Sequence, residues 1–314
     1  MLLSTREADL FESYRGRLEA IAYRLLGSAG DAEDAVQEVF LRWHAADREH
    51  IDVPEAWLTK VLTNLCLNQL TSARARRETY VGQWLPEPVL AGDRMLGPAD
   101  TVEQRESVSF AMLTLMERLS PNERVVYVLR EAFGYSHAEV AELLDLTESN
   151  CQQIYRRAKQ HLVTGRARQE IDTAAAHRIV EEFLAAAASG ETEPLVKLLA
   201  DDAFVLGDGG GWIMTVPSPV VGALKVARFV RNRFRPGTHD LDRFGGRPLA
   251  YAAVANGHPA IVLAVGERVV AVAVLEITGD GIVSVLGQGN PAKLDRATRQ
   301  WAAAEHGEPL LEMW

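Results

Sequence analysis

Cysteine and histidine are both scarce in this chain of 314 residues. The two cysteines, Cys66 and Cys151, lie far apart, which excludes a disulfide-rich scaffold and predicts free thiols in a reducing compartment. The eight histidines do not show metal-ligand spacing with one another or with cysteine. We therefore expect no structural metal.

Long apolar runs are also missing. The most apolar stretch, 259–278, is interrupted by Glu267 and Arg268, and charged residues interrupt the first ten positions. These interruptions argue against a membrane-spanning helix and against a secretory signal peptide. We expect a cytoplasmic protein without a membrane partner.

An excess of positive charge is absent as well. The formal net charge is −10, which argues at first against a nucleic-acid-binding protein. The acidic residues are concentrated in 79–107 and 169–314, whereas 147–168 contains five basic residues and only Glu148 as an acid. A basic island in an acidic chain is what local contact with DNA phosphates requires.

The spacing of apolar residues divides the chain into parts. Helical spacing covers 1–78 and returns in 108–168. The stretch 79–107 between them loses this spacing and contains the proline-rich sequence WLPEP at 84–88, which is typical of a linker. We expect two helical domains joined by a linker.

Beyond residue 168 the pattern becomes mixed. The sequence predicts helices over 169–188, 191–200 and 222–235, and strands over 203–207, 212–216, 248–255, 259–266, 268–278 and 281–287. Turn signals such as Asn256-Gly257 separate the later strands. Helices followed by a meander of long antiparallel strands predict an α+β cone over 169–294, rather than a parallel sheet. The remaining segment, 295–314, is a polar, alanine-rich tail.

The sequence 136–163 has the pattern of a helix-turn-helix. Ser136 and Glu139 form a capping box for a first short helix, and Thr147 can cap a second one after a tight turn. The second helix exposes Gln152, Gln153, Arg156, Arg157 and Lys159. Gln and Arg side chains suit adenine and guanine edges, so DNA recognition is one interpretation. Two core helices of a bundle with a solvated charged face are the other.

An acidic face lies beside an apolar stripe on the predicted helix 31–43, whose expected N-cap is Asp31. Asp34 and Glu38 are four positions apart, and such a like-charge pair destabilises a helix by roughly 0.2–0.5 kcal/mol. The face is either solvated or a docking surface for a basic partner.

Taken in order, these motifs resemble those of the extracytoplasmic-function (ECF) RNA polymerase sigma factors. Residues 30–41, GDAEDAVQEVFL, resemble the region-2 helix that binds the polymerase β′ clamp. Residues 56–65 are similar to the segment that opens and recognises the −10 promoter element. Residues 119–124 and the following helix-turn-helix resemble region 4, which recognises the −35 element. The resemblance implies an alternative sigma factor that binds core RNA polymerase through the β′ clamp and β flap, with no enzymatic activity and no cofactor.

By position, the resemblance also implies roles for three groups of side chains. The expected polymerase-binding residues are Asp34, Gln37 and Glu38. The residues expected to contact the −10 strand are Lys60, Asn64, Asn68, Arg74, Arg76 and Arg77. Those expected to recognise the −35 element are Ser149, Asn150, Gln152, Gln153, Arg156 and Arg157. Amides can hydrogen-bond splayed bases, and arginines supply a basic track along the strand.

Three further signatures resemble one ECF subgroup, in which a SnoaL-like (NTF2-like) domain follows region 4. They are WLPEP at 84–88, DGGG at 208–211 and NPAKL at 290–294. Trp212 and Ala292 depart from the pattern, since a basic residue is expected at the first position and an acid at the second. The resemblance implies that this domain contacts the sigma regions and tunes their activity. The expected interdomain residues are Asp208, Gly209, Gly210, Gly211, Asn290, Pro291, Lys293 and Leu294.

Two other function classes remain open at this stage. A one-component repressor would combine the helix-turn-helix with a ligand-sensing NTF2-like domain, but it leaves the acidic helix and the asparagines of 1–78 unexplained. An enzyme would need a base inside an apolar pocket, and the candidates Asp208, Tyr251 and His258 form no evident constellation. A ligand pocket without catalysis is a further possibility.

Overall fold

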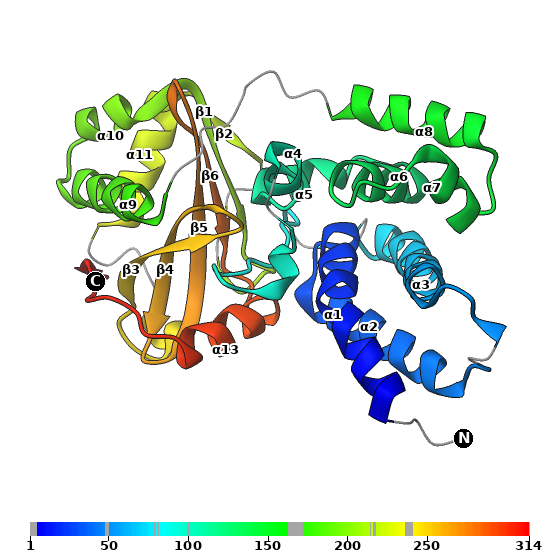
Figure 1. Cartoon of the computed structure of the whole chain (residues 1–314). Coiled ribbons are helices and arrows are strands. Elements are labelled where there is room, and N and C mark those ends of the chain that lie inside the picture. Colours follow the sequence, from blue (N-terminus) through cyan, green and yellow to red (C-terminus); the bar gives the residue numbers. More distant parts are fainter. Residues whose placement is uncertain are drawn as a thin grey trace. The chain divides into compact units, whose positions relative to one another are not determined.

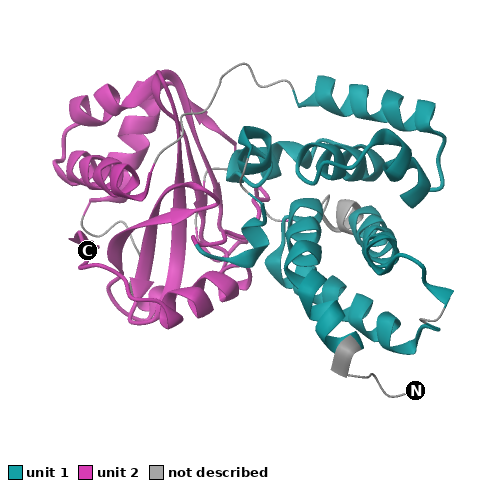
Figure 2. Cartoon of the chain, in the orientation of Figure 1, with its two compact units in different colours: residues 1–79, 92–164 teal, residues 80–91, 165–314 magenta. Residues whose placement is uncertain are grey.

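The computed structural model describes residues 5–47, 50–77, 80, 82–98, 101–162, 172–213, 215, 218–235 and 241–313 (Figure 1). The chain forms two compact units (Figure 2). Unit 1 comprises Met1–Thr79 and Gly92–Thr164, and unit 2 comprises Tyr80–Ala91 and Gly165–Trp314. The chain therefore leaves unit 1 at Tyr80 and returns to it at Gly92. We call residues 80–91 the linker segment.

Three helices form the first part of unit 1: α1 (Thr5–Leu26), α2 (Ala29–Ala45) and α3 (Pro54–Arg77). The apolar stripe of α2 is buried, as the sequence predicts. The predicted N-cap was wrong, because the helix begins at Ala29 and the Ser28 hydroxyl accepts a hydrogen bond from the Asp31 amide. Asp31 lies instead in the first turn, where a carboxylate still interacts favourably with the helix dipole.

Shorter helices complete unit 1. They are η2 (Arg94–Leu96), α4 (Val102–Glu106), α5 (Phe110–Met116), α6 (Pro121–Glu131), α7 (His137–Leu143) and α8 (Glu148–His161). The start of α6 is fixed by a capping box between Ser120 and Glu123 and by Pro121 at the first helical position. This cap sets where α6 begins, and α6 in turn packs against α1, α3, α7 and α8.

Unit 2 is built on one seven-stranded sheet with the strand order β2-β1-β6-β5-β4-β3-β7. Its strands are β1 (Leu199–Asp208), β2 (Val220–Val221), β3 (Leu249–Ala255), β4 (His258–Val265), β5 (Arg268–Thr278), β6 (Gly281–Gln288) and β7 (Leu311–Glu312). Its helices are α9 (Thr173–Ala188), α10 (Glu193–Leu198), α11 (Ala223–Arg233), α12 (Leu241–Phe244), η3 (Pro291–Lys293) and α13 (Asp295–Ala303). The predicted architecture of two helical parts followed by an α+β part is confirmed.

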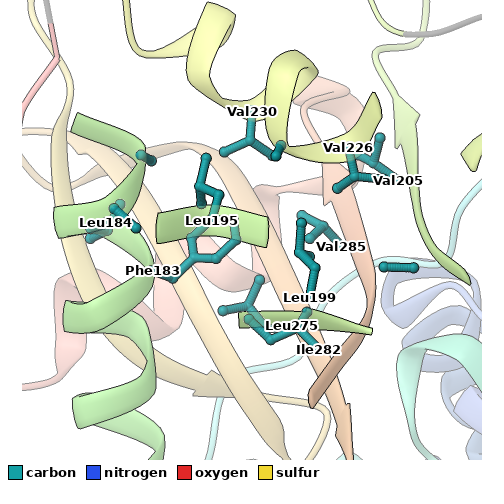
Figure 3. Close-up of a cluster of buried hydrophobic side chains, with 14 of the residues drawn as sticks. Phe183, Leu184, Leu195, Leu199, Val205, Val226, Val230, Leu275, Ile282 and Val285 are labelled. Carbon is teal, nitrogen blue, oxygen red and sulfur yellow. The ribbon is translucent and has the colours of Figure 1, made fainter. Parts of the chain in front are cut away.

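Helices α9, α10 and α11 lie together on one side of the sheet (Figure 1). The main core of unit 2 fills the space between these helices and the sheet. Figure 3 shows Phe183 of α9 and Val230 of α11 in the same apolar cluster as Leu275 of β5. Each such buried side chain stabilises the fold by roughly 1.5–3 kcal/mol relative to its exposed state. On the other face, Trp301 of α13 packs edge-on against Tyr251 of β3.

The sheet differs from its predicted form in three places. The predicted strand 212–216 is wrong at its described positions, 212, 213 and 215, because the Trp212 and Ile213 amides both turn back to the Gly209 carbonyl; positions 214 and 216 lie outside the described residues. The predicted helix 191–200 ends early, at Leu198, where β1 begins. The sheet is mixed rather than wholly antiparallel, since β1 pairs with β6 in parallel. Local patterns do not show which strand pairs with which, so this pairing could not be predicted.

Candidate functional site

The acidic face of α2 is available to a partner. Asp34 and Gln37 are exposed, while Glu38 is half-buried and forms an ion pair with Arg42, with 2.8 Å between Oε1 and Nε. Leu41, one turn further along the same face, is 53% exposed. A single exposed leucine is common on protein surfaces, so the polar side chains remain the main feature of this face. The sequence analysis gave Leu41 no separate role.

Helix α3 presents two of the expected −10 residues to solvent. Asn64 and Asn68 are exposed and lie one turn apart. Lys60, one turn earlier, is half-buried and donates to the Asp145 carboxylate at 2.8 Å and to the Glu142 carbonyl at 3.4 Å. The side chains of Arg74, Arg76 and Arg77 lie outside the described residues.

Helices α7 and α8 have helix-turn-helix geometry. Both helices begin at an N-cap: the Ser136 side chain accepts a hydrogen bond from the Glu139 amide, and the Thr147 side chain accepts one from the Asn150 amide. Asp145 makes the turn between them with a left-handed φ of 54°. Cys151 and two other apolar side chains of α8 are buried. The residues expected to recognise the −35 element, Ser149, Asn150, Gln153, Arg156 and Arg157, are exposed, whereas Gln152 is half-buried and donates to Glu148.

Two buried arginines join the halves of unit 1. Arg124 of α6 donates to the Arg24 carbonyl at the C-terminal end of α1, at 3.2 and 3.3 Å, and pairs with Glu117. The Arg24 side chain donates to Ser107 and to the Leu96 carbonyl. Burial lowers the pKa of Arg124 to about 9 and that of Arg24 to about 10, so both stay charged at neutral pH. Cations at the end of α1 also complement its dipole.

In unit 2, a buried carboxylate holds the linker segment. Asp208, at the end of β1, is completely buried. Its Oδ1 accepts from the Tyr80 hydroxyl at 2.6 Å and the Gly210 amide at 3.0 Å. Its Oδ2 accepts from the Leu85 amide at 3.0 Å, Lys293 at 2.7 Å and, at 3.4 Å, Gln288. A buried charge needs such a complete set of donors, and here two of them come from the linker segment.

The partners of Asp208 bind the linker segment as well. Lys293 donates to the Leu85 carbonyl at 2.8 Å and lies over the rings of Tyr80 and Trp84. Gln288 donates to the Leu85 and Pro86 carbonyls at 3.2 and 3.0 Å. We call Tyr80, Asp208, Gln288, Asn290 and Lys293 the Asp208 cluster. Burial and the Asp208 hydrogen bond raise the pKa of Tyr80, which keeps its phenol protonated as a donor.

Asn290 closes the cluster next to the glycines. It donates to the Tyr80 oxygen at 2.8 Å and caps η3 by accepting from the Ala292 amide. Gly210 has a φ of 54°, and a Cβ there would overlap the Asn290 side chain. At this position glycine is therefore required by both conformation and space.

The linker segment is attached at a second place. The Val89 amide donates to the side-chain oxygen of Asn256 at 3.0 Å, and the Asn256 amide donates to the Val89 carbonyl at 2.9 Å. The Leu90 amide donates to Gln300 of α13 at 3.1 Å. The linker segment thus behaves as an added edge of unit 2, although it lies between two segments of unit 1 in sequence.

The eight expected interdomain residues fall into two sets. Asp208, Gly210, Asn290 and Lys293 come together in or beside the Asp208 cluster. Of the other four, Gly211 and Pro291 are exposed, Gly209 packs against Ile213, and Leu294 is buried at the end of η3. Tyr80, Gln288, Asn256 and Gln300 were missed. Only Asn256 carried a sequence signal, as part of a predicted Asn-Gly turn.

The described part of the chain holds no group of three or more metal-ligating side chains. No helix among the same residues combines the length and apolar character that crossing a bilayer requires. Asp208, Tyr251 and His258, weighed above as catalytic candidates, do not line the described cavity of unit 2.

Comparisons with known proteins match both helical parts and, with some relatives, up to 91% of the chain. Residues 10–76 match the Sigma-70 region 2 family, and residues 109–162 match the Sigma-70 region 4 family. ECF RNA polymerase sigma factor SigJ of Mycobacterium tuberculosis is 40% identical over 248 residues, which is 78% of each chain. Probable ECF RNA polymerase sigma factor SigI of the same species is 30% identical over 91% of this chain and 93% of its own. The crystal structure of SigJ superposes with a TM-score of 0.68 at 33% identity, covering 91% of this chain and 98% of that one.

Proposed function

Because the chain belongs to the ECF RNA polymerase sigma factors, we propose that α2, α3 and α8 divide the work of promoter-specific initiation among them. In this division α2 binds the core enzyme, α3 binds the −10 element and α8 recognises the −35 element. The C-terminal part of unit 2 regulates all three through the linker segment.

The role of α2 rests on its exposed face. Asp34 and Gln37 are free of the packed stripe, and Leu41 extends the face with an apolar contact. A basic partner helix, such as those of the β′ clamp, removes the like-charge repulsion between Asp34 and Glu38. The acidic face is therefore more favourable in the complex than in the isolated chain.

Helices α3 and α8 are suited to different forms of DNA. The exposed amides of Asn64 and Asn68 can donate to and accept from unstacked bases of the −10 strand. Helix α8 presents Gln153 and Arg156 in the position of a recognition helix in the major groove. Contact with the β flap completes the proposed holoenzyme.

The proposal of regulation rests on the direct contact between α3 and the turn before α8, the two parts proposed to bind DNA. Lys60 of α3 lies 2.8 Å from Asp145, in the turn that precedes α8. The −10 and −35 elements are roughly 25 base pairs apart, or about 85 Å along B-form DNA. One compact unit cannot reach both elements, so the arrangement described here is a closed form that opens on the polymerase.

The linker segment limits that opening. It connects α3 to the region that contains α5 to α8, and its hydrogen bonds hold it on unit 2. Once released, its twelve residues can span up to roughly 40 Å. Holding the linker segment keeps the two DNA-binding parts close, and releasing it allows them to separate.

Transcription in vitro tests this proposal. The full chain, mixed with core RNA polymerase and a library of genomic fragments, is expected to produce transcripts from a defined set of start sites. Asp34→Lys should weaken binding to the core enzyme, measured by pull-down, and should thereby abolish these transcripts. Glu33→Lys on the same helix should reduce core binding and transcription less. If the unsubstituted chain neither binds core polymerase nor produces start sites, the proposal is wrong.

The repressor alternative is not supported. It assigns no role to residues 10–76, which match Sigma-70 region 2 over nearly the whole of α1, α2 and α3.

A further inference from the structure

Unit 2 contains a largely apolar cavity between α11 and the sheet. Its volume is about 170 Å³. Phe229 and Phe234 at α11 face Leu263 of β4 and Ala273 of β5 across it. Engineered cavities of roughly 150 Å³ with similar linings bind benzene. The cavity is therefore large enough for a ligand that contains one aromatic ring.

One charged side chain reaches this apolar space. Among the described lining residues, Arg233 is the single charged one, and Thr215 and Gln288 are the polar ones. The Arg233 guanidinium also lies 5.8 Å from the centre of the Phe229 ring. Arg233 is half-buried, and this partial removal of the cation from water lowers its pKa. A poorly hydrated guanidinium in an apolar wall favours a carboxylate, which it can bind in a bidentate manner.

The floor of the cavity adjoins the Asp208 cluster. Gly207 of β1 pairs with Gly287 of β6, and both line the cavity. The next pair along the strands, Asp208 and Gln288, holds the linker segment. Gln288 lines the cavity as well, so the cavity and the linker segment share the ends of the same two strands.

We propose that this cavity binds a small aromatic carboxylate, with the ring between α11 and the sheet and the carboxylate on Arg233. A bound ligand orders the ends of β1 and β6 and thereby strengthens the hold of the Asp208 cluster on the linker segment. The C-terminal part is then a sensor of a small organic acid. The effect on transcription depends on the function proposed above, but the binding does not.

Calorimetry with the full chain tests the binding step without polymerase or DNA. The test ligands are 3-phenylpropionate and 3-phenylpropan-1-ol, which share the ring and chain and differ in charge. The acid is expected to bind at least tenfold more tightly than the alcohol, because the alcohol cannot form a charge-assisted pair. No binding of the acid, or equal binding of the two, overturns the proposal.

Four variants, one of them a control, locate the ligand. Arg233→Gln should reduce acid affinity at least tenfold and leave alcohol affinity nearly unchanged, whereas Arg228→Gln, exposed on the same helix, should change neither. If Arg233→Gln impairs folding, Arg233→Lys serves as the second test, because it keeps the positive charge and should retain part of the affinity for the acid. Gly287→Val should abolish binding, since a Cβ at Gly287 meets only the Leu206 carbonyl, at 3.9 Å, and otherwise projects into open space. Unchanged acid affinity in Arg233→Gln or Gly287→Val contradicts the site.

Hydrogen–deuterium exchange tests the coupling. Saturation with 3-phenylpropionate should slow exchange at the amides of Leu85 and Val89, which donate to Asp208 and Asn256. Exchange in α6 of unit 1 serves as the internal control. If the acid binds while exchange in 85–89 stays the same, the cavity is a binding site but the coupling is refuted.

Discussion

The Lys60 ammonium lies 2.8 Å from the Asp145 carboxylate, and this ion pair joins two parts of the chain that are proposed to bind different promoter elements. Lys60 belongs to the face of α3 that is proposed to bind the −10 strand, and Asp145 is the turn residue of the helix-turn-helix. If Lys60 contacts DNA as proposed, it must first leave Asp145.

Asp145→Asn should favour the open form. Asparagine tolerates the left-handed φ of this position, so the turn is preserved while the charge is removed. Both side chains are substantially exposed, which limits the pair to about 0.2–1 kcal/mol, or up to a fivefold shift in the opening equilibrium. We expect a rise of about 1.4- to fivefold in core-polymerase affinity, measured by fluorescence anisotropy.

A double-mutant cycle separates the ion pair from other effects of the substitution. In a Lys60→Gln background, Asp145→Asn should have no further effect on core affinity, because the partner charge is already gone. An equal gain in both backgrounds would show that the pair does not stabilise the closed form.

Arg124→Met should destabilise unit 1 by about 3 kcal/mol. The substitution removes the Arg124 donors from the Arg24 carbonyl and the Arg124 cation from the partly buried Glu117. Urea unfolding followed by circular dichroism measures the loss. Arg118→Met, on an exposed position nearby, is the matched control and should change stability by less than about 0.5 kcal/mol.

Lys293→Met should release the linker segment. Asp208 would keep its neutral donors but lose its cation, and the Leu85 carbonyl would lose a donor. Loss of a charged hydrogen bond of this kind corresponds to roughly a ten- to hundredfold faster exchange of the Leu85 amide. Lys225→Met, exposed on α11, is the control. Unchanged exchange at Leu85 would mean that Lys293 does not hold the linker segment.

The helix-turn-helix should lose stability in mild acid. Burial, together with Arg130 and Arg156, lowers the pKa of His137 below its ordinary value of 6.5, against the opposing effect of Glu148. The unfolded chain then binds a proton more readily than the folded one, so stability is lost as the pH falls below about 6.5. The melting temperature should drop less between about pH 7.5 and about pH 5.5 in His137→Gln than in the unsubstituted chain.

The successful sequence predictions rest on local patterns. The starts of α7 and α8 are set by capping contacts between residues three positions apart, which involve Ser136, Glu139 and Thr147. The helix-turn-helix could therefore be predicted from the sequence. The misplacement of the α2 N-cap at Asp31 has a local reason too, because Ser28 and Asp31 are both good caps three positions apart.

Contacts between distant segments could not be predicted in the same way. Gln288 reads as an ordinary polar residue at the end of a strand, yet it is wholly buried and donates to Leu85 and Pro86. The strand expected at 212–216 has suitable residue types but is prevented by the turn at Gly209. Ile213 lies close to both Gly209 and Gly289, and the second of these contacts joins segments about 75 residues apart, which a local pattern does not reveal.

The attachment of the linker segment to β6 and α13 also sets an order of events during synthesis. The hydrogen bond between Leu85 and Gln288 and that between Leu90 and Gln300 cannot form until the second residue of each pair has been synthesised, about 200 residues later. At ribosomal rates of roughly 5–20 residues per second, that interval is about 10–40 s. During the later part of this time a nascent chain already carries α2, α3 and α8 but lacks the segments that hold the linker segment. On the function proposed above, a newly made molecule can thus meet polymerase before the C-terminal part restrains it, whereas a finished one must first release the linker segment.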